Sequence, residues 1–257
     1  MGLPFDISYV FSFVPKLAST LLLTLGIVAG SLLSGLLFGL IAALPRLYRI
    51  PVLQQASVAY ASFFRGTPIL IQLFLIYYGL PELLKMAHID VTRTPVLVFV
   101  ILTYGLHTGA FVSETIRGAV MAVDRGQVEA AYALGMTGPQ AFLRIAAPQA
   151  LAIAVPVLAN QTLALLKDTS LAFTLGVMEM SGKAQSLARI TQHFLEAYLA
   201  LALLYLAVAF ILEKLLLAAE RRLLRHERPG EASGRFRLRR GLTLRKLASG
   251  LQGGSPS

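Results

Sequence analysis

The sequence has no cysteine and few charged residues: only 14% of its 257 residues are Asp, Glu, Lys or Arg. Without cysteine there are no disulfides, no Cys-ligated zinc, no iron–sulfur cluster and no thiol nucleophile. Soluble domains carry about 25% charged residues, so this chain has too few polar side chains to cover a water-facing surface. Hydrophobic residues make up 56% and the mean hydropathy is +0.69. These values exclude a soluble enzyme and predict an integral membrane protein.

Long apolar stretches predict an all-α fold with about five transmembrane helices. The first runs from Leu17 to Pro45 without a charge and exceeds the roughly 20 residues that cross a bilayer. A cleaved signal peptide is not expected there, because the run is too long and no small-residue cleavage site closes it. The other predicted spans are about 52–82, interrupted at 65–68; about 94–117; about 148–178, interrupted at 167–168; and about 195–217.

Basic residues predict the orientation, because loops rich in Lys and Arg stay in the cytoplasm. Sixteen of the 23 basic residues fall on one side if the 46–51 loop, the 118–147 loop and the C-terminal end are cytoplasmic. The N-terminus is then outside. We divide the chain into a transmembrane domain, 1–225, and a basic tail, 226–257, expected to be disordered and to rest near anionic lipid. Nucleic acid is not an expected partner, because no aromatic interleaving or binding motif accompanies the charge.

The predicted cytoplasmic loop between the third and fourth spans carries helix signals. Asp124 is a possible N-cap for a short helix that Gly135 ends. Thr137 can cap a second short helix with Pro139 in its first turn, and Pro148 is expected to close that segment. Two short helices at the membrane surface are therefore predicted, and a simple amphipathic connector is the alternative.

The loop spanning 124–148 also contains a recognisable spacing. Glu-Ala-Ala at 129–131 is followed after three residues by Gly135, and after nine more by Ile-Ala-Ala-Pro at 145–148. This resembles the EAA loop of binding-protein-dependent ABC importer permeases, EAA-x3-G-x9-I-x-L-P, and departs from it only where Ala147 replaces leucine. The resemblance implies a coupling helix seated in a cleft of a cytoplasmic ATPase. It implies ATPase-coupling roles for Glu129, Ala130, Ala131 and Gly135, although a solvated helix carboxylate is the alternative for Glu129.

Three further segments resemble the permeases for polar amino acids of the histidine, glutamine, glutamate and arginine type. They are FRGTPILIQLF from Phe64 with YGLP behind it, GAFVSETIRG at 109–118, and LKDTSL at 166–171. With the EAA loop they extend the resemblance over about 17–225. It implies the type I ABC importer transmembrane fold and a location in the bacterial cytoplasmic (inner) membrane. The implied partners are ATP-binding-cassette ATPase subunits, a second permease subunit as homodimer or heterodimer, and an extracytoplasmic amino acid-binding protein.

The chain itself is predicted not to be an enzyme. It contains no G-x-x-x-x-G-K-[ST] loop, so it lacks the backbone donors and the Ser or Thr that hold phosphates and magnesium. No catalytic residue or cofactor is assigned to it, and the resemblance places ATP and Mg on the partner ATPase. Metal binding is not expected either, because the four histidines show no ligand spacing.

Charged residues within spans by default mark a functional site or its counter-charge. Asp168 is the main candidate for contacting substrate, because a carboxylate near the midplane can pair with an ammonium or guanidinium group. Alternatively, Asp168, Thr169 and Ser170 cap a break in the span by bonding to freed backbone groups. His107 in the third span offers a further hydrogen bond, and Gln161 with Asn160 lies two turns before Asp168. For these amides and for His107, contacts between helices are the alternative.

The rival function is a gradient-driven carrier or channel, which also uses charges within spans but does not account for the EAA spacing. A membrane-embedded hydrolase is a third class, and the chain shows neither H-E-x-x-H nor G-x-S-x-G. The sequence does not identify the amino acid carried. In the second span, Gly66 and Pro68 beside Arg65 predict a kink. In the first span, the pairs Gly26/Gly30 and Gly35/Gly39 predict close helix packing.

Overall fold

A computed structural model describes residues 4–224, and the fold is described for these residues. The expected tail, 226–257, lies outside them. The helical elements are α1 (Ile7–Ala18), α2 (Leu21–Leu47), α3 (Pro51–Gly66), α4 (Ile69–Phe74), the π turn η1 (Leu75–Gly79), α5 (Leu80–Met86), α6 (Val96–Met121), α7 (Arg125–Ala133), α8 (Gly138–Ala141), the π turn η2 (Phe142–Ala146), α9 (Ala147–Asp168), the 3-10 helix η3 (Thr169–Leu175), α10 (Met180–Thr191) and α11 (Phe194–Leu223).

Five helical stretches are long and apolar enough to cross a membrane: Leu21–Leu47, Ile69–Met86, Val96–Met121, Gly138–Leu175 and Phe194–Leu223. Within the described residues the secondary structure is helical, with no strand. The predicted all-α fold and the count of five spans are therefore confirmed.

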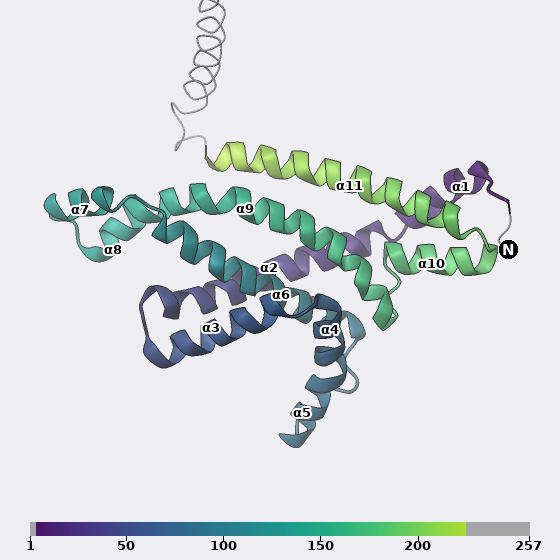
Figure 1. Ribbon diagram of the computed structural model, residues 1–257, viewed down its shortest axis with the longest axis horizontal. Coiled ribbons are helices and arrows are strands. Elements are labelled where there is room, and N and C mark those ends of the chain that lie inside the picture. The colour runs from purple at the N-terminus through teal and green to yellow at the C-terminus, as the bar shows by residue number, and fades with distance from the viewer. Residues whose placement is uncertain (1–3, 225–257) are drawn as a thin grey trace, which may run out of the picture.

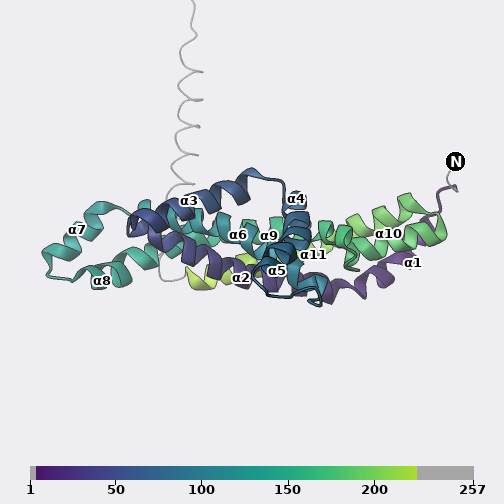
Figure 2. The ribbon, with the colours of Figure 1, turned by 90° about the horizontal axis from the view of Figure 1, so that it is seen from below.

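The long helices lie along a common axis, and different short helices lie at the two ends of the molecule. Figure 1 shows α2, α6, α9 and α11 running along the long axis, with α7 and α8 at one end and α1 and α10 at the other. The helix α3 packs on α2 and α6. Figure 2 views the bundle from below and shows α4 and α5 end-on, so this segment runs across the other helices. The central core includes Ile27, Leu73, Tyr104, Leu166 and Val208.

The second span departs from the prediction. The expected helix over about 52–82 is two segments in different directions, α3 and α4–α5, and only Ile69–Met86 is apolar enough to count as a span. The chain turns at Thr67 and Pro68, which both have extended backbone angles. A proline disfavours helical angles in the residue before it, so Pro68 ends α3 rather than merely kinking it.

The first span also begins later than predicted. Residues before Leu21 form the separate helix α1, and the two are separated by a turn at Ser19 and Thr20. Both hydroxyls bond back to backbone carbonyls, Ser19 to Lys16 at 2.7 Å and Thr20 to Leu17 at 2.8 Å. Such local bonds compete with continued helix. The helix α1 then packs against α10 and α11.

The short helix α10 begins at Glu179, a fully buried carboxylate. It accepts hydrogen bonds from the backbone N–H groups of Ser181 and Gly182 at 2.8 and 3.0 Å, and from the Tyr205 hydroxyl at 3.2 Å. Burial raises the pKa of the Glu179 carboxyl, and the two backbone donors act in the opposite direction. This N-cap fixes the connection between the fourth and fifth spans.

The segment from Gly138 to Leu175 is one continuous helical stretch, so the expectation that Pro148 closes the second loop helix is wrong. The helix α8 passes into α9 through the π turn η2, in which the N–H of Ala147 bonds to the carbonyl of Phe142. Pro148 lies in the first turn of α9. The N–H that it lacks falls where regular helical bonding is already interrupted, so proline is tolerated there.

Glycines bring α2 and α6 into close contact. A Cβ atom added at Gly39 would lie 2.6 Å from the Val112 Cβ and 3.0 Å from the Gly109 carbonyl oxygen. One at Gly35 would lie 2.9 Å from the Thr108 Cβ. The predicted packing role is therefore confirmed for this pair. It is wrong for Gly26, where an added Cβ would have no neighbour within 4 Å.

We expect Gly39→Ala to destabilise the protein and Gly26→Ala to leave its stability unchanged or slightly higher. The same methyl group is added to the same helix, but only at position 39 must it force α2 and α6 apart. Overpacking of this kind costs about 1–3 kcal/mol. The thermal unfolding midpoint of the two variants in one detergent measures the difference, and equal midpoints would contradict the packing role of Gly39.

Candidate functional site

A cavity of about 340 Å³ lies between α6 and α9. Three of the predicted substrate-contacting residues meet there: His107 from α6, and Gln161 and Asp168 from α9. Asn160 also lines the cavity. The rest of the wall is formed by Thr108, which carries a hydroxyl, and by the apolar side chains of Phe111, Val157, Ala164 and Leu165.

The other two predicted residues do not reach this cavity. Thr169 is fully buried, and its hydroxyl donates a hydrogen bond to the Leu166 carbonyl at 2.7 Å. Ser170 lines a second cavity together with Lys167, Tyr198 and Tyr205. The helix tightens from α to 3-10 directly after Asp168, and this change of period turns the following side chains away from the first cavity.

A buried amide holds His107 at the cavity edge. The Gln72 Nε2 atom donates to the Phe64 carbonyl at 2.8 Å, the Thr67 carbonyl at 2.9 Å and the Thr67 hydroxyl at 2.8 Å. These acceptors identify Nε2 as the donor end of the amide, so Oε1 accepts a hydrogen from His107 Nδ1, 2.9 Å away. In the neutral ring the other nitrogen, Nε2, is then a hydrogen-bond acceptor.

The cavity therefore offers acceptor groups in excess. Asp168 contributes a carboxylate and neutral His107 an imidazole nitrogen. The Gln161 side chain does not add to them: its Nε2 donates to the Thr115 hydroxyl at 2.9 Å, and its Oε1 atom is buried away from the cavity space, without a partner within residues 4–224. A cationic donor group such as an ammonium matches these acceptors.

Gln72 lies within the segment that resembles the permease second span, but no role was predicted for it. We expect Gln72→Leu to destabilise the protein, because it leaves two carbonyls at the end of α3 without their donor. Leaving buried polar groups unsatisfied costs about 1–3 kcal/mol each. Gln149→Leu is the matched control, because Gln149 makes one bond, to the Ile145 carbonyl in the preceding helical turn. Unfolding midpoints in detergent compare the two, and an equal loss would contradict the special role of Gln72.

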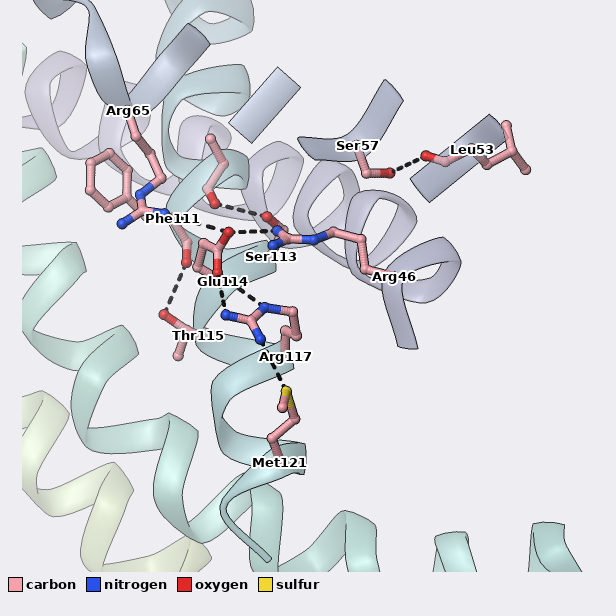
Figure 3. A network of polar contacts seen from close by, with 11 residues as sticks. Arg46, Leu53, Ser57, Arg65, Phe111, Ser113, Glu114, Thr115, Arg117 and Met121 are labelled. Carbon is pink, nitrogen blue, oxygen red and sulfur yellow. Dashed lines mark hydrogen bonds and ion pairs between the residues drawn. The ribbon is translucent and has the colours of Figure 1, made fainter. Parts of the chain in front are cut away.

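A charge cluster joins the ends of α2 and α3 to α6, as Figure 3 shows. Glu114 on α6 pairs with Arg46 of α2 at 2.6 Å, Arg117 of α6 at 3.1 Å and Arg65 of α3 at 3.4 Å. The Arg65 guanidinium also lies over the ring of Phe111, 5.6 Å from its centre. One carboxylate thus pairs with three guanidinium groups. In the sequence, Glu114 stood out only as part of the segment GAFVSETIRG, and no ion pair was predicted for it.

The loop predicted to couple to an ATPase has the expected local structure. The Asp124 carboxylate caps α7 by accepting from the Gly126 N–H at 2.9 Å. Gly135 has a φ of +79°, a left-handed conformation that favours glycine. Thr137 and Gln140 form a capping box at α8. Both short helices are confirmed, although α8 continues into η2 and α9.

The predicted coupling residues lie on different faces of α7. Glu129 and Ala130 are exposed, whereas Ala131 is buried and anchors the helix. Tyr132 and Leu134 are also exposed, at 53% and 81%. An exposed face that combines a carboxylate with large apolar side chains is suited to docking another protein. In the described part of the chain there is no group of three His, Cys, Asp or Glu residues placed to hold a metal ion.

These features define a class: a multi-pass helical membrane protein with a polar cavity between two long helices and a short exposed helix in the loop that joins them. The family model described as "Binding-protein-dependent transport system inner membrane component" matches residues 35–225, and the chain belongs to this family. It is therefore the membrane-spanning permease subunit of an ABC importer. The ATPase of such an importer is a separate subunit, so the rival of a gradient-driven carrier is not supported.

Named relatives and a solved structure agree with this assignment. The chain is 46% identical to the L-cystine transport system permease protein TcyL of Bacillus subtilis, covering 87% of this chain and 93% of that protein. It is 32% identical to the glutamine transport system permease protein GlnP of Escherichia coli, covering 85% and 98%. A crystal structure of an amino acid ABC transporter with histidines has a TM-score of 0.76 and 30% identity, covering 86% and 100%. The predicted type I importer fold is confirmed.

Proposed function

We propose that this permease subunit carries a polar amino acid through the cavity between α6 and α9. The observation that supports this proposal is that α6 and α9 both line the polar cavity and both connect to α7 and α8, which together are called the coupling segment. The helix α6 leads within three residues into α7, and α8 continues through η2 into α9. A displacement of α8 thus reaches the α9 wall of the cavity through continuous helix, and a displacement of α7 reaches the α6 wall through a connection of only three non-helical residues.

The chemistry of the cavity supports an amino acid as the cargo. Every amino acid presents an α-ammonium group, and the Asp168 carboxylate together with the His107 acceptor nitrogen matches such a donor. Relatives are named for transport of L-cystine and glutamine, which both carry this group. Which amino acid is imported depends largely on the binding protein that delivers it.

The remaining parts of the importer follow from the coupling segment. An ATPase subunit binds ATP and Mg and receives α7 in a cleft, with Glu129 facing a basic or helix N-terminal feature. Exposed Ala130 allows close approach of the ATPase, buried Ala131 holds α7 against the permease instead of contacting the ATPase, and Gly135 forms the turn into α8. A second permease subunit, identical or related, completes the pathway, and an extracytoplasmic binding protein delivers the amino acid.

The same proposal sets the orientation. The end with α7 and α8 faces the cytoplasm and the N-terminus faces outward, in the cytoplasmic membrane of a bacterium. The basic residues support this, because Arg46, Arg49, Arg117 and Arg125 line one cavity together with residues of α7 and α8, and Arg144 lies in η2 next to α8.

We expect Asp168→Asn to lower the rate of amino acid uptake about 10- to 100-fold, the range for losing a charged hydrogen bond of about 1.5–3 kcal/mol. The assay is uptake into proteoliposomes that contain the complete importer with its binding protein. Asp90→Asn is the matched control, because Asp90 is exposed in the loop before α6 and bonds to Thr92. Unchanged uptake in Asp168→Asn would rule out recognition by this carboxylate.

A further inference from the structure

A third cavity, lined by several basic residues, lies apart from the proposed amino acid pathway. It has a volume of about 740 Å³ and lies where the ends of α2 and α6 meet the coupling segment. Four arginines line it: Arg46, Arg49, Arg117 and Arg125. They come from α2, the α2–α3 loop, α6 and α7, so the chain converges on this point from four parts of the sequence.

The positive charge of this cavity is not balanced by the residues around it. Glu129 is the one carboxylate in its wall, and Glu114 lies behind it, paired with Arg46 and Arg117 as Figure 3 shows. Four arginines against two carboxylates leave an excess of two positive charges. Arg49 and Arg125 are exposed and have no ion pair within residues 4–224. Guanidinium groups in this arrangement match the oxygens of a phosphate.

Apolar side chains complete the cavity wall and indicate more than a free anion. Val58, Val120, Met121, Val128 and Phe142 stand among the four arginines. Arg46 and Arg117 lie within stretches long enough to cross a membrane, at the ends of α2 and α6. The cavity therefore lies near the depth at which lipid headgroups join their acyl chains, and basic pockets between helices at this depth favour anionic lipid headgroups.

We propose that this cavity binds an anionic phospholipid, with the phosphate against the arginines and the start of an acyl chain along the apolar wall. The lipid then contacts α7 through Arg125 and the transmembrane core through Arg46 and Arg117. It supplies the negative charge that the chain lacks where the coupling segment meets the bundle. Only the choice of the cytoplasmic leaflet rests on the proposed function.

The test uses the full-length chain, purified in mild detergent with its co-purifying subunits and stripped of lipid by detergent exchange. Phosphatidylglycerol, phosphatidylcholine and inorganic phosphate are added separately, and the thermal unfolding midpoint is followed against concentration. We expect a saturable rise with phosphatidylglycerol alone. Arg49→Gln combined with Arg125→Gln should raise the half-saturating concentration about thirtyfold, which corresponds to about 1 kcal/mol for each removed charge.

The matched control is Arg93→Gln combined with Arg189→Gln, which removes the same charge from exposed positions outside the cavity. An equal loss in this control, or an equal response to phosphatidylcholine, would overturn the proposal. An equal response to inorganic phosphate would show a site for free phosphate instead. A response that the isolated permease shows and the assembly lacks would mean that the ATPase occupies the cavity. None of these readouts measures transport, so failure here is distinguishable from failure of the proposed function.

Discussion

Glu129→Arg is expected to abolish ATP-driven import while the permease remains folded. Glu129 is exposed on α7 and has no hydrogen bond or ion pair within the described chain, so its replacement leaves the fold intact. A positive charge facing a basic or helix N-terminal feature of the ATPase costs several kcal/mol. We therefore expect at least about a thirtyfold loss of ATPase affinity, which corresponds to about 2 kcal/mol. Co-purification of the ATPase and uptake into proteoliposomes measure the two effects.

Gln127→Arg is the control for this prediction. Gln127 is also exposed on α7, two residues from Glu129, and so points to a different side of the helix. It adds positive charge to the same short helix without placing it at position 129. If both variants lose the ATPase equally, general charge on α7 is responsible and Glu129 has no specific role. Normal import by Glu129→Arg would remove the coupling assignment altogether.

Glu114→Gln is expected to destabilise the bundle strongly. It removes the one carboxylate that Arg46, Arg65 and Arg117 share and leaves three guanidinium groups facing each other. Breaking a buried ion pair costs about 3–5 kcal/mol, and Glu114 is one-fifth exposed, so we expect about 3 kcal/mol. The thermal unfolding midpoint and the yield of folded protein in detergent measure this loss.

Arg65→Gln provides the comparison within the same cluster. Arg65 has a side chain that is 45% exposed, and it contacts Glu114 at 3.4 Å while two other arginines remain in place. Exposed ion pairs contribute about 0–1 kcal/mol, so this variant should be close to wild type in stability. A loss as large as that of Glu114→Gln would show that all three arginines are needed together and that the carboxylate is not the centre of the cluster.

The features of the fold that could be predicted are those set by local sequence. Apolar length determined the count of five spans, and Asp124, Gly135 and Thr137 predicted the ends of the two loop helices. The separate helix α1 was missed, and at Pro68 only a kink was predicted where α3 in fact ends, because hydropathy measures apolar content and carries no information on where a helix stops. Pro148 was interpreted as a helix end because the π turn before it depends on packing that the sequence pattern does not show.

Part of the candidate site could be predicted because polar residues within membrane spans are rare. His107, Gln161 and Asp168 were each selected on that ground, and the structure places them around one cavity. The sequence could not separate Thr169 and Ser170 from Asp168, because the switch to a 3-10 helix decides where they point. Gln72 was missed because its partners, the carbonyls of Phe64 and Thr67, become available only where α3 ends.

The π turn η2 also has a consequence for the coupling helices: the direction in which α7 and α8 point depends on how many residues this turn contains. Successive residues of an α-helix are rotated by about 100° around its axis, and a π turn accommodates one residue more than a regular turn. Deleting one residue from Phe142–Ala146 would restore regular helix and rotate α8 and α7 around the axis of α9 by about that angle. A permease whose chain differs here by a single residue would present an unchanged helix α7 to a different side of its ATPase.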